Sequence, residues 1–110
     1  MTEAIQFIQV NHIDSFQKLR VLIFFYQHPE SSWTGPQIAK QLYLGDGPLL
    51  EEIVTELQAA GLVSCVAHRC KLSNEAGVRL PLQHLINRYK NPLARQEILD
   101  QVRHSAIFNQ

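Results

Sequence analysis

The stretch of ten residues from Trp33 to Leu42 constrains the fold more than any other part of the 110-residue chain. Thr34 is followed three residues later by Gln37, a spacing typical of a capping box, in which each side chain bonds to the other residue's backbone N–H. Pro36 falls in the first turn, where a helix does not need the N–H that proline lacks. The sequence therefore predicts a short helix over about 35–42.

A second helix is predicted directly after the first. The intervening residues 43–47 contain two glycines, which permit a tight turn, and either Asp46 or Gly47 can cap the second helix. Pro48 lies in the opening turn, and Gly61 is placed to end the helix in a left-handed conformation. The apolar residues of this helix recur with helical spacing at Leu50, Ile53, Val54 and Leu57.

Beyond Gly61 the apolar period changes from helical to alternating, which predicts a β-hairpin. With Ala67 and His68 as a two-residue loop, Cys65 lies directly opposite Cys70. One face would then carry Val63, Cys65, Cys70 and Leu72, and the other Ser64, Val66, Arg69 and Lys71.

Helices are also predicted on both sides of this region. Residues 14–28 form the first, with Asp14 as N-cap and Gln17 as its capping-box partner. Its inward stripe is expected to contain Phe16, Leu19, Ile23 and Tyr26, broadened by Leu22 and Phe25.

Two further helices are predicted near the C-terminus. One begins at Leu80 with Pro81 in its first turn, and Asn91 caps another that runs to about His104. The inward residues of this last helix are expected to be Leu93, Ile98, Leu99 and Val102.

The composition fits one folded domain, since 45% of residues are hydrophobic and 18% charged. The expected fold class is mainly α with a small β-hairpin. The predicted domain covers 1–110, divided into an N-terminal arm (1–13), a core (14–72), C-terminal helices (73–104) and a tail (105–110).

The order helix, capped short helix, second helix and hairpin over residues 14–72 resembles a winged helix-turn-helix domain. The segments 33–42 and 57–63 resemble the second helix and the helix-to-wing junction of small bacterial transcription regulators. This resemblance implies a winged-helix regulatory module with double-stranded DNA as partner, and C-terminal helices used for dimerisation or core closure. It also implies that the helix over 48–60 enters the major groove.

The charge of that helix is unusual for a DNA reader. Residues 46–60 contain four acidic and no basic residues, although neutralisation of phosphates supplies most non-specific DNA affinity. The alternative is a winged-helix protein-interaction module in which the acidic helix meets a basic partner. An exposed Leu49 among the acids would suit such an interface. Equally, Leu49 could pack against Leu44 while the acids only keep the helix soluble.

Basic residues concentrate in the rest of the chain, because residues 61–110 hold seven Lys and Arg against three Asp and Glu. Opposite charges in two regions are compatible with self-association, so a homodimer is expected, and the arm residues Ile5, Phe7, Ile8 and Val10 could be exchanged between copies. The residues expected to contact nucleic acid or a partner are Thr34, Lys40, Pro48, Leu49, Glu51, Glu52, Thr55, Arg69 and Lys71.

The sequence favours neither catalysis nor a bound cofactor, because it contains no nucleophile elbow and no glycine-rich phosphate loop. Cys65, His68 and Cys70 resemble metal ligands, but the cysteines share a face with core residues and are expected to be structural. Their thiols are expected to be free, because a reducing cytoplasm is the default compartment for a chain without a secretory signal. The same geometry also permits a cross-strand disulfide. The first ten residues lack the basic region of a secretory signal, and the longest apolar run, Val21–Tyr26, is too short to span a membrane. A cytoplasmic location is therefore expected.

Overall fold

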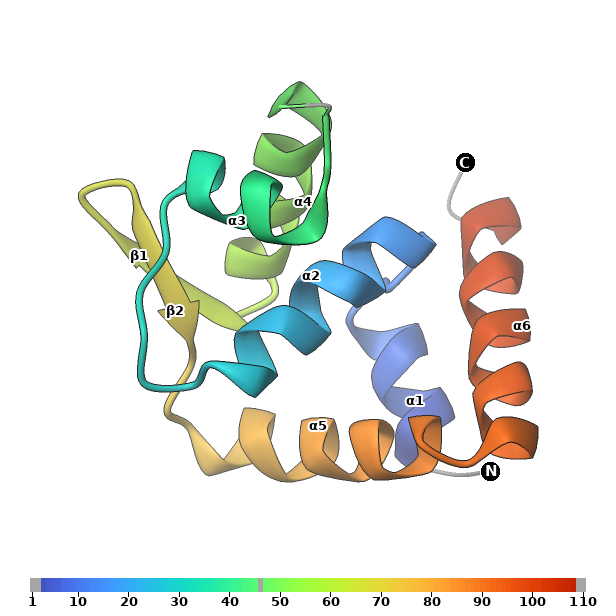
Figure 1. Ribbon diagram of the computed structural model, residues 1–110. Coiled ribbons are helices and arrows are strands. Elements are labelled where there is room, and N and C mark those ends of the chain that lie inside the picture. The colour runs from blue at the N-terminus through green and yellow to red at the C-terminus, as the bar shows by residue number, and fades with distance from the viewer. Residues whose placement is uncertain (1–2, 46, 109–110) are drawn as a thin grey trace. The chain divides into compact units, whose positions relative to one another are not determined.

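The computed structural model describes residues 3–45 and 47–108. In this part of the chain the fold is mainly helical with one small antiparallel hairpin, which confirms the predicted fold class (Figure 1). The elements in chain order are α1 (Glu3–Val10), α2 (Phe16–Gln27), α3 (Gly35–Leu42), α4 (Gly47–Ala59), β1 (Val63–Val66), β2 (Arg69–Leu72), α5 (Ala76–Tyr89) and α6 (Pro92–Phe108).

The chain divides into two compact units. One combines Met1–Leu19 with Glu75–Gln110, and the other is the continuous stretch Arg20–Asn74. The boundary falls within α2, so the short helices and the hairpin predicted as the central motif all belong to the continuous unit.

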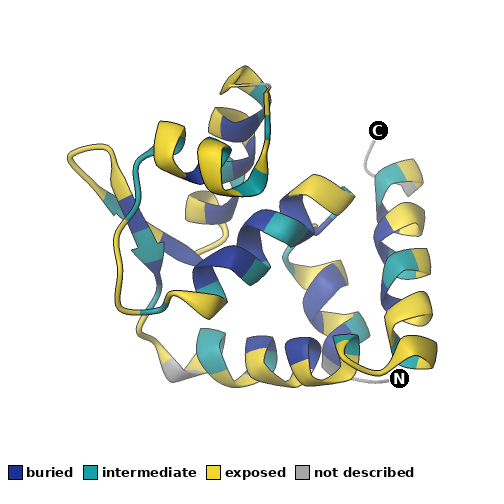
Figure 2. Cartoon of the chain, in the orientation of Figure 1, coloured by how far each residue is buried: buried dark blue, intermediate teal, exposed yellow. Residues whose placement is uncertain are grey.

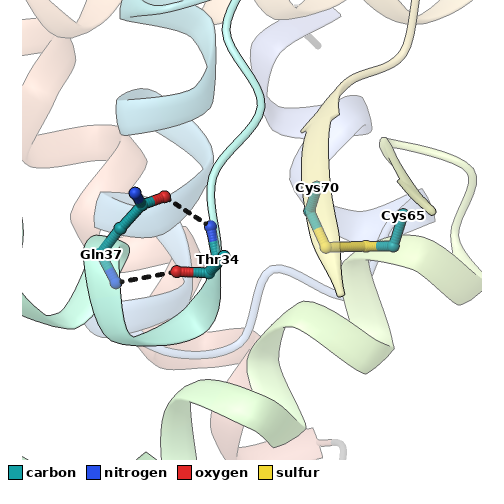
Figure 3. Close-up of a disulfide and its surroundings, with 4 residues drawn as sticks. All are labelled: Thr34, Gln37, Cys65 and Cys70. Carbon is teal, nitrogen blue, oxygen red and sulfur yellow. Dashed lines mark hydrogen bonds between the residues drawn. A yellow bond between two sulfur atoms is a disulfide. The ribbon is translucent and has the colours of Figure 1, made fainter. Parts of the chain in front are cut away.

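The capping box at the start of α3 is present as predicted. The Thr34 side chain accepts a hydrogen bond from the backbone N–H of Gln37 at 3.3 Å. In return, the Gln37 side chain accepts one from the backbone N–H of Thr34 at 2.9 Å (Figure 3). Two N–H groups that lack partners at any helix start are thus satisfied, which fixes where α3 begins.

The end of α3 differs from the prediction, because a tyrosine and not a glycine makes the left-handed turn. Tyr43 has φ 56° and ψ 39°, and its N–H bonds to the carbonyl of Ala39. Its side chain is 93% exposed, so the turn gains no packing from the ring. The two glycines after it do not provide the helix stop.

Replacing Tyr43 with glycine should therefore raise the free energy of unfolding by about 1 kcal/mol, because glycine adopts positive φ without the steric cost that other residues meet. Urea unfolding followed by the fluorescence of Trp33, the single tryptophan of the chain, measures this change. Tyr43→Ala is the control, since alanine keeps the Cβ and should give no gain. A gain as large for alanine would contradict the explanation.

Helices α3 and α4 are separate and pack against each other, and α4 also packs against β1. Leu50, Ile53 and Leu57 are buried on α4 as the spacing predicts, and Val54 is half-buried. The predicted cap Asp46 lies outside the described residues.

A left-handed glycine ends α4 as predicted. Gly61 has φ 78° and its N–H bonds to the carbonyl of Gln58 at 3.0 Å. The N–H of Leu62 bonds to the carbonyl of Leu57, also at 3.0 Å. This pair of bonds is a Schellman motif, which turns the chain from helix into strand.

The hairpin has the predicted register, with Val63 opposite Leu72 and Cys65 opposite Cys70. Ala67 and His68 form the loop, and both have positive φ, 52° and 65°. The alternation of faces is also confirmed, because Val63, Cys70 and Leu72 are buried and Cys65 is half-buried, while Ser64, Val66 and Arg69 are exposed and Lys71 is half-buried.

An extended residue before α3 is paired with the hairpin. Trp33 and Cys70 exchange two backbone hydrogen bonds, of 2.7 and 2.8 Å. The Trp33 ring packs edge-on against Phe24 of α2, with 5.0 Å between ring centroids. These contacts attach the start of α3 to β2 within the Arg20–Asn74 unit.

The buried face of α2 differs from the predicted stripe. Phe16 is 48% exposed, and Ile23 and Tyr26 are only half-buried. The buried face is instead formed by Leu19, Val21, Leu22, Phe24 and Phe25. Figure 2 shows that much of α2 is buried. The reason is that almost every residue from 19 to 26 is apolar, so several overlapping stripes satisfy the helical period equally well.

The cap of α2 also differs from the prediction. Ser15, and not Asp14, accepts the hydrogen bond from the backbone N–H of Lys18, at 3.0 Å. Asp14 instead lies 3.7 Å from the Lys18 ammonium group, which is buried and donates to the carbonyl of His12 at 2.8 Å.

The segment interpreted as an N-terminal arm forms helix α1 in the described residues. Its side chains Ala4, Phe7 and Ile8 are buried, and α1 packs against α5 and α6 within its own unit. Of the apolar residues proposed for exchange between copies, only Val10 is largely exposed.

The two C-terminal helices are longer than predicted. Pro81 lies inside α5, which starts at Ala76 and not at Leu80. Proline removes only one backbone bond there, and Gly77, whose carbonyl would have accepted it, is exposed to water. Helix α6 is capped as predicted, since the Asn91 side chain accepts from the N–H of Leu93 at 2.9 Å, but it continues to Phe108.

Candidate functional site

A groove of about 580 Å³ opens on the Arg20–Asn74 unit between the start of α3, one face of α4 and the inner face of the hairpin tip. Its volume lies in the range of sites that take a small ligand or a few side chains. The lining residues are Thr34, Gly35, Pro36, Ile38, Leu50, Glu51, Val54, Thr55, Gln58, Cys65, His68 and Cys70.

Cys65 and Cys70 are joined by a disulfide (Figure 3). Both cysteines line the groove on its hairpin side. The expectation of free thiols is therefore wrong, and no described cysteine is free. The backbone of Cys70 bonds to Trp33 and not to Cys65, so the two cysteines form a non-hydrogen-bonded pair, the arrangement in which facing side chains lie closest. Their Cα atoms are 4.0 Å apart. Free thiols were expected because the cytoplasm is reducing, but the short distance between the two cysteines allows the disulfide to form.

Part of the groove lining is apolar. Ile38 and Leu50 belong to the lining but are buried, so the apolar surface that a ligand can reach comes from Pro36, which is exposed, and from Val54 and Cys65, which are half-buried. This surface offers a site for a small aliphatic group, because apolar surface removed from water favours binding.

The α4 side of the groove is polar and acidic. Thr55 and Gln58 are exposed, and neither side chain has a hydrogen bond within the described residues. The Thr34 hydroxyl is already used in the capping box. Glu51 is the only carboxylate of the lining, which contains no lysine or arginine.

Glu51 and Glu52 place two negative charges on the exposed surface of α4. Both are exposed, and neither has an ion pair or hydrogen bond in the described part of the chain. Glu56 differs, since it is half-buried and has a partner. Helix α4 carries no basic residue, so nothing on the helix itself neutralises the two exposed carboxylates.

The structure brings some of the predicted contact residues together and separates others. Thr34, Glu51 and Thr55 line the groove. Leu49 is half-buried and so is not the exposed anchor that the interface hypothesis required. The remaining candidates lie outside the groove lining and are Lys40, Pro48, Leu49, Glu52, Arg69 and Lys71.

The outer face of the hairpin carries the two cations proposed for a wing patch. Arg69 is exposed and donates a long hydrogen bond of 3.5 Å to the carbonyl of Ser32. Lys71 is half-buried on the same face. The strands have four residues each and the loop only two, so the hairpin is too short to carry these cations far toward a DNA groove.

Sequence reasoning missed several lining residues, among them Val54, Gln58 and His68. The first two could have been found, since residues 51, 54, 55 and 58 follow one another at helical spacing along one face. His68 could not, because its place at the groove depends on how the hairpin packs against α4.

The described residues contain no group of three or more His, Cys, Asp or Glu able to hold a metal ion. Each described helix is too short or too polar to cross a bilayer. Comparisons of the chain with models of protein families, with curated proteins and with solved structures gave no match.

Proposed function

We propose that Arg20–Asn74 is a winged-helix protein-interaction module that binds a basic surface of a partner protein through α4 and the adjacent groove. The element order supports the winged-helix assignment, because α2, the extended Trp33, α3, α4 and the hairpin follow one another as in that family. The proposal assigns neither catalysis nor a cofactor to this unit.

The exposed charge of α4 is the observation that carries the proposal. In a DNA-reading winged helix this helix lies in the major groove, between two lines of phosphates. There Glu51 and Glu52 would be repelled by the negative phosphates, and α4 carries no basic residue to neutralise them. Against a protein surface rich in lysine and arginine the same charges are attractive and speed association.

DNA binding by a transcription-regulator-type module is the second candidate. The exposed Arg69 and its neighbour Lys71 favour it, since a wing contacts phosphates in that family. Two cations neutralise few phosphates, so any affinity should be low and should fall with a shallow salt dependence.

Charge reversal on α4 separates the two candidates. The probes are a fluorescein-labelled peptide with one leucine between two pairs of lysines and a labelled random-sequence duplex DNA, both at low salt. We expect the protein to bind the peptide and not the duplex. Glu51→Lys combined with Glu52→Lys should weaken peptide binding by roughly tenfold or more, about 1.4 kcal/mol, and should raise affinity for the duplex.

The matched control makes the same change of charge away from α4 and the groove. Glu30→Lys with Asp100→Lys adds the same charge at two exposed positions. This variant should keep the affinity of the natural chain for the peptide. Duplex binding by the natural chain with loss of affinity in Arg69→Ala and Lys71→Ala would instead establish the second candidate and remove the first.

The proposal includes a cytoplasmic location, as the sequence leads us to expect. Thiol-reducing systems of that compartment would act on the bond between Cys65 and Cys70. The binding experiments are therefore run with and without reductant.

A further inference from the structure

We propose that the groove on α3, α4 and the hairpin receives the α5–α6 corner of a second copy of this chain, with Leu93 as the inserted side chain. This inference rests on the proposed function, because it names the partner of the same groove. The two surfaces support it separately.

Leu93 is an exposed aliphatic side chain at a fixed place. It is the second residue of α6 and is 81% exposed, although the sequence predicted it to be buried. Its N–H bonds to the Asn91 side chain, which holds the corner in a defined conformation. Single exposed leucines are common on protein surfaces, so its surroundings decide what it can do.

The surroundings of Leu93 are basic. Arg88, Lys90 and Arg95 lie within five residues of it along the chain, against the single carboxylate of Glu97. Arg88 lies 3.7 Å from Glu97, whereas Lys90 has no ion pair among the described residues.

Arg95 is held in place by its own helix corner. Its Nε donates to the carbonyl of Tyr89 at 2.8 Å, and its guanidinium lies 5.1 Å from the centre of the Tyr89 ring. A cation fixed in this way loses little side-chain entropy when it meets a carboxylate. The corner thus presents one apolar side chain with at least one preorganised cation beside it.

The groove has the complementary features. Its accessible apolar surface comes from Pro36, Val54 and Cys65. Its α4 side carries Glu51 with Glu52 beside it, and its lining contains no lysine or arginine. The Thr55 hydroxyl and the Gln58 amide are available for hydrogen bonds. Asn87 and Asn91, which line a hollow next to Leu93, offer amide side chains that match them.

The pairing of two different surfaces determines the kind of assembly. Every copy carries one groove and one corner, so association is either a reciprocal pair or a head-to-tail chain. In both cases the contact depends on Leu93 in one copy and on the acidic residues of α4 in the other. The same variants therefore test the contact whether the copies form a closed pair or an open chain.

Sedimentation velocity of the full chain from roughly 1 to 200 μM at low salt tests the contact. We expect the average mass to rise with concentration and the association to weaken at high salt, because the rim contacts are ionic. Leu93→Asn should weaken self-association by about tenfold or more. A chain that stays monomeric at every concentration would overturn the inference.

Mixing two charge-reversed variants tests the assigned partners directly. Variant one is Glu51→Lys with Glu52→Lys, and variant two is Lys90→Glu with Arg95→Glu. Each alone brings like charges together and should be monomeric. In a mixture each groove finds a corner of opposite charge, so association should return.

Controls keep the result specific to these surfaces. Arg103→Glu, on an exposed part of α6, should associate like the natural chain, and far-UV circular dichroism checks that every variant is folded. Failure of the mixture to associate would overturn the pairing. If the chain is monomeric but still binds the lysine–leucine peptide in a manner dependent on Glu51, the proposed function stands and only the second copy is excluded as partner.

Discussion

Phe25→Ala is expected to lower the free energy of unfolding of the Arg20–Asn74 unit by about 3–5 kcal/mol. Phe25 is fully buried on α2, and its ring lies edge-on to Phe24 with 6.1 Å between centroids. Truncation removes most of the buried side chain and leaves a cavity that the neighbouring helices cannot fill completely.

Urea unfolding followed by Trp33 fluorescence measures the loss, because Trp33 belongs to the same unit and packs against Phe24. Ile23→Ala is the matched control on the same helix and in the same unit. Ile23 is only half-buried, so its truncation should cost no more than about 1–2 kcal/mol. Equal losses for the two variants would mean that the stripe predicted from the sequence, which includes Ile23, is the buried one.

The parts of the fold that the sequence predicted well have short-range signals. The capping box of Thr34 and Gln37, the left-handed Gly61 and the alternation across the hairpin each involve residues a few positions apart. Such patterns are decided by backbone hydrogen bonds and steric limits that do not depend on the rest of the chain.

The parts that were missed depend on tertiary packing. Periodicity does not choose the buried face of α2, because its apolar residues surround the helix. It also does not show that α1 packs against α5 and α6, or that Leu93 stays exposed at a helix start. Pro81 was placed at a helix start because proline is commonest there, yet an exposed turn tolerates it inside α5.

Only the part of the candidate site that depends on short-range signals was predicted from the sequence. The acidic outer face of α4 follows from local spacing, and the exposed Glu51 and Glu52 agree with it. The groove forms only when α3, α4 and the hairpin pack together, so neither its apolar lining nor the position of His68 could be derived from the sequence. The cross-strand cysteine pair was recognised, but register alone does not decide between thiols and a disulfide.

Removal of this disulfide is expected to cost about 2 kcal/mol of unfolding free energy, the value for a closed loop of six residues in the chain-entropy description. The variant Cys65→Ala with Cys70→Ala tests it in urea. Alanine is preferred to serine because Cys70 is buried, and a serine hydroxyl there would add a desolvation cost of its own.

Reductant provides the control without a substitution. Dithiothreitol should lower the stability of the natural chain by a similar amount and leave the double variant unchanged. The hairpin tip adds a reason to expect local loosening, because Ala67 and His68 both hold positive φ, at a cost of roughly 1–2 kcal/mol each. Equal stability of the natural chain with and without reductant would contradict a bond that constrains the unfolded chain.

Loss of the disulfide should also weaken binding at the groove, since Cys65 and Cys70 form one of its sides and His68 at the tip lines it too. The peptide affinity of the double variant should therefore fall even where urea unfolding shows that the protein is fully folded. The conditions under which the affinity falls distinguish two effects. A loss in the folded variant reports on the shape of the groove, whereas a loss that appears only near the unfolding transition reports on stability alone.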